Sequence, residues 1–303
     1  MDLFDFHAHF FARPFFDALA AQSPQGGSPE EKLARVTSET GIELPSDDVK
    51  EHTARWLAEL DQHGVARMAA FASLPDEVPA VAEAAKESDG RLVPFSLVNP
   101  CVEDAPAKVE RLISELGFRG VLMFPAMHHY AIDGAEARAV FEVLARHKAP
   151  AFVHCGLLVV KLRDLLGLPR VQDMQFANPL SLIPAANAHP EVPFIIPHFG
   201  AGLFREALLA GAQCENIYVD TSSTNSWRRT QPEAPDLAQV FERALEVFGP
   251  ERVLFGTDSN VFPAGWRAER HAEQREVLGA LGMSDEDQAA IFGGNAARLI
   301  DEA

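Results

Sequence analysis

The sequence predicts an α/β fold in which parallel strands alternate with helices. Two observations carry this prediction: short apolar runs recur along the chain, and segments with helical periodicity and charged outer faces separate them. Strands that alternate with helices pair in parallel and are joined by crossover helices. The length of 303 residues suits a barrel of about 250 residues with eight strand–helix units. We therefore expect a single (β/α)8 TIM-barrel domain over residues 1–303.

The predicted strands are short and mostly apolar. They cover Leu3–His9, Val65–Ala72, Leu92–Val98, Gly120–Phe124, Ala151–His154, Pro193–His198, Ile217–Thr221 and Val253–Asp258. The predicted helices are amphipathic and cover Val49–Gln62, Val78–Glu87, Ala105–Leu116, Ala135–Arg146, Leu237–Phe248 and Arg267–Leu281, with weaker patterns at Ser181–His189 and Phe204–Ala212.

Two long connections interrupt the alternation. Residues 10–48 follow the first predicted strand, and residues 155–180 follow the fifth. Both lie at the carboxyl ends of strands, where barrel enzymes keep their active sites. Connections of this length are often lids or binding loops, although variable surface loops without a role fit the pattern equally well.

Composition restricts the partners and the compartment. The formal net charge of -18 and the isoelectric point near 5.0 argue against nucleic acid as a partner. No apolar run reaches membrane-spanning length. The first residues lack the basic region of a secretory signal, and three cysteines suit a reducing compartment. We expect a cytoplasmic protein that acts on a small molecule, with homo-oligomerisation left open.

Polar side chains stand at the ends of four predicted strands. His7 and His9 end the first strand, His154 the fifth, His198 the sixth and Asp258 the eighth. A single histidine in such a position is more often structural than functional, but five such residues favour a common site. Closure of a barrel would bring the eighth strand beside the first. Imidazole nitrogens and a carboxylate oxygen are ligands for a metal such as zinc.

Asp5 precedes the two histidines in the segment "LFDFHAHFF". Alternation along a strand places Asp5, His7 and His9 on one face. Asp5 is thus a candidate acceptor that orients a ligand imidazole. A hydrogen bond to backbone near the start of the strand is an equally good interpretation.

The ordered motifs "DFHAHF", "FVHCG", "IIPHFG", "LFGTDSNVFPAGW" and "GGNAARLI" resemble the amidohydrolase superfamily. The similarity is to the amidohydrolase-related (amidohydrolase 2) group that includes the aminocarboxymuconate-semialdehyde decarboxylase type. This resemblance implies a (β/α)8 barrel with metal-binding His7, His9 and His154. It also implies that Asp258 is the eighth-strand aspartate, and that His198 acts on water or substrate.

One departure from the family pattern bears on the number of metals. Binuclear members carry a carboxylated lysine at the end of the fourth strand, where this chain has Met123 and Phe124. The resemblance therefore implies one divalent ion, for which we expect zinc.

Three hypotheses for function follow. The first is a mononuclear metal-dependent hydrolase of a small amide, lactone or ester, in which Asp258 moves the proton and His198 orients water or stabilises an oxyanion. The second is a nonoxidative decarboxylase of an aromatic or muconate-like acid. The third is a barrel that binds without catalysis, against which the presence of all five polar residues argues.

Cations near the predicted mouth could anchor a substrate carboxylate. We favour His129 and Arg205 because both closely follow strand ends. A solvated surface charge is the competing interpretation for each.

Overall fold

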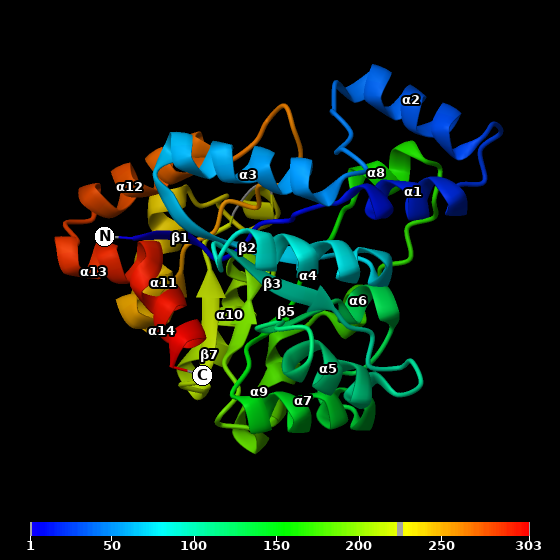
Figure 1. Cartoon of the computed structure of the whole chain (residues 1–303). Helices are drawn as coiled ribbons and strands as arrows, with labels where there is room; N and C mark the ends of the chain where they lie inside the picture. Colours follow the sequence, from blue (N-terminus) through cyan, green and yellow to red (C-terminus); the bar gives the residue numbers. More distant parts are fainter. Residues whose placement is uncertain (1, 223–226, 303) are drawn as a thin grey trace.

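The computed structural model describes residues 2–222 and 227–302 and contains one eight-stranded parallel sheet (Figure 1). Its strands are β1 (Leu3–Asp5), β2 (Val65–Ala72), β3 (Leu92–Leu97), β4 (Gly120–Met123), β5 (Ala151–Val153), β6 (Phe194–Ile196), β7 (Ile217–Asp220) and β8 (Val253–Leu254). Each strand pairs in parallel with the next, in the order β1 to β8. This arrangement confirms the predicted (β/α)8 barrel.

The barrel closes just beyond the ends of β8 and β1. The Phe6 amide donates to the Phe255 carbonyl at 2.9 Å, and the Asp258 amide donates to the His7 carbonyl at 2.8 Å. The His9 amide then donates to the Ser259 carbonyl at 2.8 Å. The last strand therefore lies beside the first, and the predicted site residues take part in the closure.

Helices follow the strands and cover the outside of the barrel (Figure 1). They are α1 (Arg13–Gln22), α2 (Pro29–Thr40), α3 (Val49–His63), α4 (Val78–Glu87), α5 (Ala105–Ser114), α6 (Pro125–His128), α7 (Ala135–His147), α8 (Lys161–Leu165), α9 (Leu182–Ala188), α10 (Phe204–Gln213), α11 (Leu237–Phe248), α12 (Ala268–Ala280), α13 (Asp285–Ala289) and α14 (Asn295–Asp301). No helix within the described ranges is long and apolar enough to cross a membrane.

Aromatic rings fill the barrel beneath its mouth. Phe152 is fully buried on β5, and its ring lies 5.1 to 5.3 Å from the rings of Phe6, Phe71 and Phe95. The His7 ring contacts the same Phe152 edge to face, at 5.9 Å. Because this cluster is packed without contact to solvent, it forms a rigid floor under the histidines.

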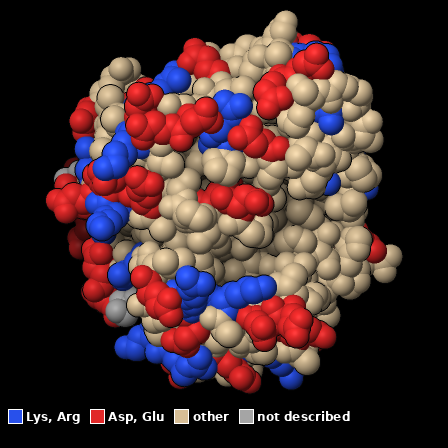
Figure 2. All heavy atoms as spheres, turned by 45° about the vertical axis from the view of Figure 1, so that its right-hand side comes forward, with Lys and Arg blue, Asp and Glu red and all other residues tan. Residues whose placement is uncertain are grey.

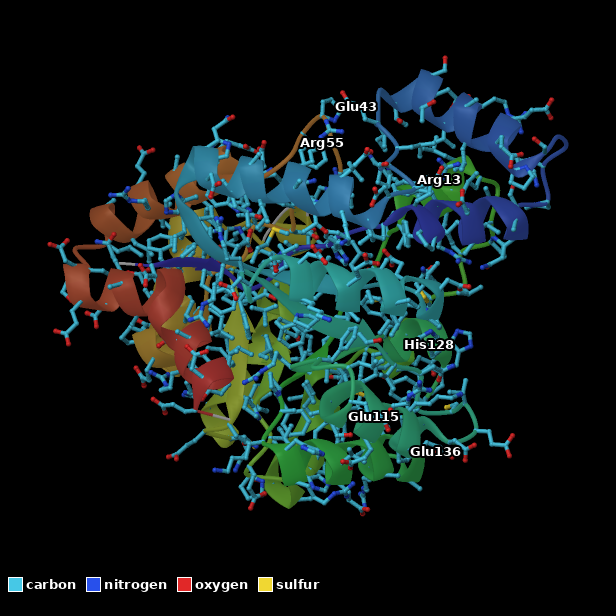
Figure 3. All side chains as sticks on the ribbon, in the orientation of Figure 1. Arg13, Glu43, Arg55, Glu115, His128 and Glu136 are labelled. Carbon is cyan, nitrogen blue, oxygen red and sulfur yellow. The ribbon has the colours of Figure 1, made fainter. Side chains whose placement is uncertain are left out.

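The two long connections contain helices and pack against each other. Helices α1 and α2 belong to the first connection and α8 to the second, and Figure 1 shows them together at one end of the barrel. Phe16, Leu19 and Leu166 are buried in a hydrophobic cluster separate from the main core. Glu43, after α2, pairs with Arg55 of α3 and ties this unit to the barrel (Figure 3).

Replacing Phe152 with alanine should lower the free energy of unfolding by about 3–5 kcal/mol, because the cavity would lie in a core that cannot collapse. Chemical denaturation monitored by circular dichroism measures this change. Leu209→Ala is the control: its side chain is 46% exposed, so it should change stability by only about 0.5 kcal/mol. Similar small losses in both variants would contradict a rigid floor.

Candidate active site

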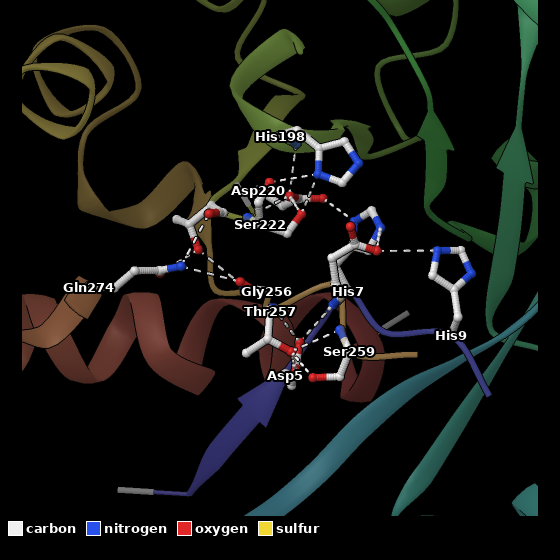
Figure 4. Close-up of polar contacts among 12 residues, drawn as sticks. Asp5, His7, His9, His198, Asp220, Ser222, Gly256, Thr257, Ser259 and Gln274 are labelled. Atoms are coloured by element: carbon white, nitrogen blue, oxygen red, sulfur yellow. Dashed lines mark hydrogen bonds and ion pairs between the residues drawn. The ribbon is translucent and has the colours of Figure 1, made fainter. Parts of the chain in front are cut away.

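The five predicted polar residues gather at the carboxyl end of the barrel, where Figure 4 shows three of them, His7, His9 and His198. The strands end earlier than predicted: His7 and His9 lie beyond β1, His154 directly follows β5, and His198 and Asp258 lie beyond β6 and β8. Because these residues lie beyond the regular strands, hydrogen bonds in the connections orient the rings of His7, His9 and His198. His198 and Asp258 both adopt left-handed backbone conformations, with φ of 56° and 58°.

A buried carboxylate sets the orientation of His7. His7 Nδ1 donates to Asp220 Oδ2 at 2.6 Å, so in the neutral ring the lone pair lies on Nε2. Burial opposes protonation of His7, but Asp220, Asp258 and Asp5 together outweigh burial and raise the pKa of the imidazole. The other oxygen of Asp220 accepts the backbone amides of His198 and Ser222, each at 3.0 Å, and the Ser222 hydroxyl.

Asp258 faces the two histidines of the first strand. Its Oδ1 lies 3.5 Å from His9 Nε2 and 3.8 Å from His7 Nε2. Two ligands held about 2.1 Å from one ion lie about 3–3.5 Å apart, so this spacing is close to that of a metal site. Burial raises the pKa of Asp258, but the surrounding imidazoles reverse this and hold it well below its usual range.

The surroundings of His198 specify its tautomer. His198 Nδ1 lies 2.6 Å from the Ser222 carbonyl oxygen, which can only accept. Nδ1 therefore carries the proton, and Nε2 is an acceptor in the neutral ring. Burial and the neighbouring His7 lower the pKa of His198 and favour that neutral form. The His198 ring lies 4.7 Å from the ring of His7.

His154 lies beside His198, with 5.2 Å between ring centroids. Burial, reinforced by His198, lowers the pKa of His154 to about 3, so its imidazole is neutral. Its buried Nδ1 has no hydrogen-bond partner among the described residues. A buried polar atom without a partner is costly, and a neutral imidazole in this state is suited to bind a metal.

Two sets of three residues could each hold a metal ion, because the ligand atoms within each set all lie within 4.8 Å of one another. The first set is His7, His9 and Asp258, and the second is His7, His198 and Asp220. Asp220 already accepts several protein donors, so the first set is the better candidate for a metal centre. Its two nitrogens and one carboxylate oxygen suit zinc and similar divalent metals. His154 belongs to neither set, and its role as a ligand stays a prediction.

The model of the family described as Amidohydrolase matches residues 4–301. The chain belongs to this family. Such a match over nearly the whole chain confirms the resemblance seen in the motifs and makes the protein an enzyme of the amidohydrolase superfamily.

Solved structures share the fold of this amidohydrolase at low sequence identity. The 5-carboxyvanillate decarboxylase of Sphingomonas paucimobilis superposes with a TM-score of 0.65 at 15% identity, covering 99% of each chain. The 5-carboxyvanillate decarboxylase of Novosphingobium aromaticivorans, complexed with manganese and 4-hydroxy-3-methoxy-5-nitrobenzoic acid, gives 0.65 at 17%, covering 99% of this chain and 96% of that one.

A probable 2-pyrone-4,6-dicarboxylic acid hydrolase of Acinetobacter baumannii gives a TM-score of 0.62 at 13% identity, covering 99% of this chain and 100% of the other. No protein of curated function matches the amidohydrolase significantly in sequence. At these identities the structural comparisons establish the fold alone.

Asp5 has a different role in this amidohydrolase from the one that strand alternation suggested. It accepts the backbone amides of His7 and Thr257, the Thr257 hydroxyl at 2.5 Å, and the Trp266 indole at 2.9 Å. The chain bends at His7, so Asp5 and His7 do not share a face. The prediction that Asp5 orients an imidazole was wrong, and the alternative of a hydrogen bond to backbone is confirmed.

The two residues favoured for substrate binding lie on the surface. His129 is exposed, and its Nε2 donates to the Val171 carbonyl at 2.5 Å. Arg205 is exposed in the first turn of α10. Their roles stay predictions.

Asp220, which ends the apolar strand β7, is a site residue that sequence reasoning undervalued. Its position at the end of an apolar strand was the available signal in the sequence. Its partner His7 could not be identified in this way, because the two residues lie 213 positions apart.

Asp220→Asn should weaken binding of a divalent metal roughly 10- to 100-fold, as expected when the partner of a ligand histidine is lost. Both oxygens of Asp220 accept hydrogen bonds from N–H or O–H groups. Whichever way the asparagine amide is oriented, its NH₂ group therefore faces a donor and loses that hydrogen bond. Titration of metal-free protein with Co²⁺ against a competing chelator measures the affinity. Asp301→Asn is the control, because Asp301 is an exposed carboxylate that pairs with Arg67, and this change should leave the Co²⁺ affinity unchanged. Equal Co²⁺ affinity in the two variants would contradict this role of Asp220.

Proposed function

We propose that this amidohydrolase is a mononuclear metal-dependent hydrolase of a small carboxylate-bearing lactone, ester or amide. The observation that carries the proposal is the position of Asp258 Oδ1, 3.5 Å from His9 Nε2 and 3.8 Å from His7 Nε2. A carboxylate next to two imidazole lone pairs combines a metal site with a group that can accept a proton.

His7, His9, Asp258 and His154 would hold the metal, with zinc expected. A bound divalent ion of this kind lowers the pKa of water to about 7 and polarises a carbonyl group. The buried, neutral state of His154 and the fixed tautomer of His7 both suit this binding. The ion would thus activate water and the carbonyl group, and side chains of the protein would transfer the protons and orient the water.

Asp258 and His198 would move and orient the protons. Asp258 takes a proton from the attacking water and returns it to the leaving group. His198 accepts a hydrogen bond at Nε2, because its Nδ1–H donates to the Ser222 carbonyl. In its neutral form His198 would therefore orient water rather than stabilise an oxyanion.

The substrate we propose is a small ring that carries carboxylate groups. The face in Figure 2 is hollowed near its centre, and residues other than Lys, Arg, Asp and Glu line most of that hollow. Solved structures with this fold include enzymes named for 5-carboxyvanillate and 2-pyrone-4,6-dicarboxylic acid, both carboxylated rings. His129 and Arg205 remain the proposed anchors for a carboxylate.

Nonoxidative decarboxylation is the second candidate, supported by the likeness to two 5-carboxyvanillate decarboxylases. Asp258 would then deliver a proton to carbon as carbon dioxide leaves. Incubation with 2-pyrone-4,6-dicarboxylate or 5-carboxyvanillate in H₂¹⁸O or D₂O separates the two reactions. Hydrolysis places ¹⁸O in the product carboxylate, whereas decarboxylation releases carbon dioxide and places deuterium on the ring.

The purified protein should contain close to one equivalent of a divalent transition metal, and chelation should abolish turnover, because the nucleophile depends on the metal. His7→Ala and His9→Ala should lose the metal, measured by elemental analysis. His147→Ala is the control, since His147 pairs with Glu110 on α5, away from the site, and should retain it. Two tightly bound metals per chain would contradict the mononuclear proposal.

Asp258→Asn should lower turnover by ~10²–10⁴-fold, the usual contribution of general acid–base catalysis. Asparagine keeps the size and one oxygen ligand but cannot accept the proton. Single-turnover rates of variants with matched metal content separate chemistry from product release. A wild-type rate in metal-loaded Asp258→Asn would show that another group moves the proton, and His198→Ala would then be the next variant to measure.

A further inference from the structure

Glu77 is a buried carboxylate that neither the family motifs nor the proposed chemistry uses. It ends a short 3-10 helix (Pro75–Glu77) after β2, and its side chain is fully buried. No cation pairs with it within residues 2–222 and 227–302 of the structure. Burial raises its pKa to about 8, although hydrogen bonds from backbone amides oppose this rise. Such a group is costly to bury, so its contacts need a reason.

The two oxygens of Glu77 join the segments that leave β1 and β2. Oε1 accepts the amide of Ala12 at 2.9 Å. Oε2 accepts the amides of Ser73 at 2.7 Å and Leu74 at 3.1 Å. The chain after His9 and the chain after β2 are therefore held at a fixed separation by one side chain.

Ser73 connects Glu77 to His9. Its Oγ lies 2.8 Å from His9 Nδ1. When His9 Nδ1–H donates to this hydroxyl, the lone pair of the ring lies on Nε2, which faces Asp258. Ser73 thus has the relation to His9 that Asp220 has to His7.

Phe11 connects Glu77 to His9 by a second route. The Phe11 ring stacks on His9 at 4.7 Å and 18°, and on Phe15 at 4.1 Å and 14°. Its backbone φ is 38°, a left-handed conformation that a bulky residue adopts only when its surroundings impose it. The Ala12 amide, which immediately follows, is the group held by Glu77 Oε1.

We propose that Glu77 is a positioning residue of the metal centre, holding Ser73 at Nδ1 and Phe11 on the face of His9 so that Nε2 stays aimed at the metal. The inference rests on the proposed function, since it requires His9 to be a ligand. It adds two residues, Glu77 and Ser73, that act on the metal through His9 without touching the substrate.

If Glu77 had a purely structural role, it would stabilise the loops without affecting metal affinity. A control residue with a comparable structural role distinguishes the two possibilities. Asn216 also binds three backbone groups, donating to the carbonyls of Ala186, His189 and Val192 at 3.1 Å each. It precedes β7, at the opposite end of the barrel from the histidines. Asn216→Ala therefore removes a comparable set of backbone contacts far from the site.

The experiment measures the affinity of the metal-free full chain for Co²⁺, by competition with a chelator, together with thermal stability. Ser73→Ala and Glu77→Gln should each bind Co²⁺ roughly 10- to 100-fold more weakly than wild type. In glutamine an NH₂ group replaces one of the two carboxylate oxygens, and that NH₂ group cannot accept a hydrogen bond from a backbone amide. Glutamine therefore cannot make all three hydrogen bonds that Glu77 makes with backbone amides. Ser73→Thr keeps the hydroxyl and should restore affinity to near the wild-type value.

Asn216→Ala should lower the melting temperature while its Co²⁺ affinity stays that of wild type. Should Glu77→Gln fail to fold, Ser73→Ala against Ser73→Thr still tests the contact with His9 through which Glu77 is proposed to act. Wild-type affinity in Ser73→Ala, or an equal loss of affinity in Asn216→Ala and Glu77→Gln, would overturn it. A wild-type protein that binds no Co²⁺ would instead overturn the proposed function.

Discussion

The hydrogen bond from the Asp258 amide to the His7 carbonyl is the contact on which both the barrel and its candidate site depend. It joins the segment after β8 to the segment after β1 at 2.8 Å. The same contact brings the Asp258 carboxylate against the imidazoles of His7 and His9. Because β1 and β8 are only three and two residues long, closure relies on residues beyond the strands. Closure of the barrel and assembly of the site therefore share this contact.

Three buried carboxylates organise the surroundings of that contact. Asp5 bonds to Thr257 and the Trp266 indole, Asp220 to His7 and the turn after β6, and Glu77 to the segments after β1 and β2. Each of these carboxyl groups accepts several donors, which offsets the cost of burying it. Most of these donors are backbone amides, so the carboxylates determine where loops lie as well as how side chains point.

Unusual backbone conformations occur in the same loops. Phe11, His198 and Asp258 all have positive φ, although none is glycine. Such conformations cost about 1–3 kcal/mol each and persist only where the surroundings over-determine them. The hydrogen bonds of Asp220 and Glu77, and the packed aromatic floor, supply that restraint. The site is therefore rigid because of its neighbours, which suits groups that must hold a metal in one geometry.

The barrel and the gathering of site residues at one end of it could be predicted from the amino-acid sequence, and these residues are His7, His9, His154, His198 and Asp258. Apolar runs alternating with amphipathic helices specify parallel strands, and the carboxyl ends of parallel strands meet at one face. These inferences need only periodicity and chain order.

The orientation of each of these side chains depends on tertiary contacts that the sequence does not reveal. The bend at His7 placed Asp5 on a different face, the Ser222 carbonyl set the tautomer of His198, and Asp220 and Ser73 were brought to the histidines. These contacts join residues 24 to 213 positions apart. Local sequence patterns do not predict such pairs, because these side chains come into contact only when the loops pack together.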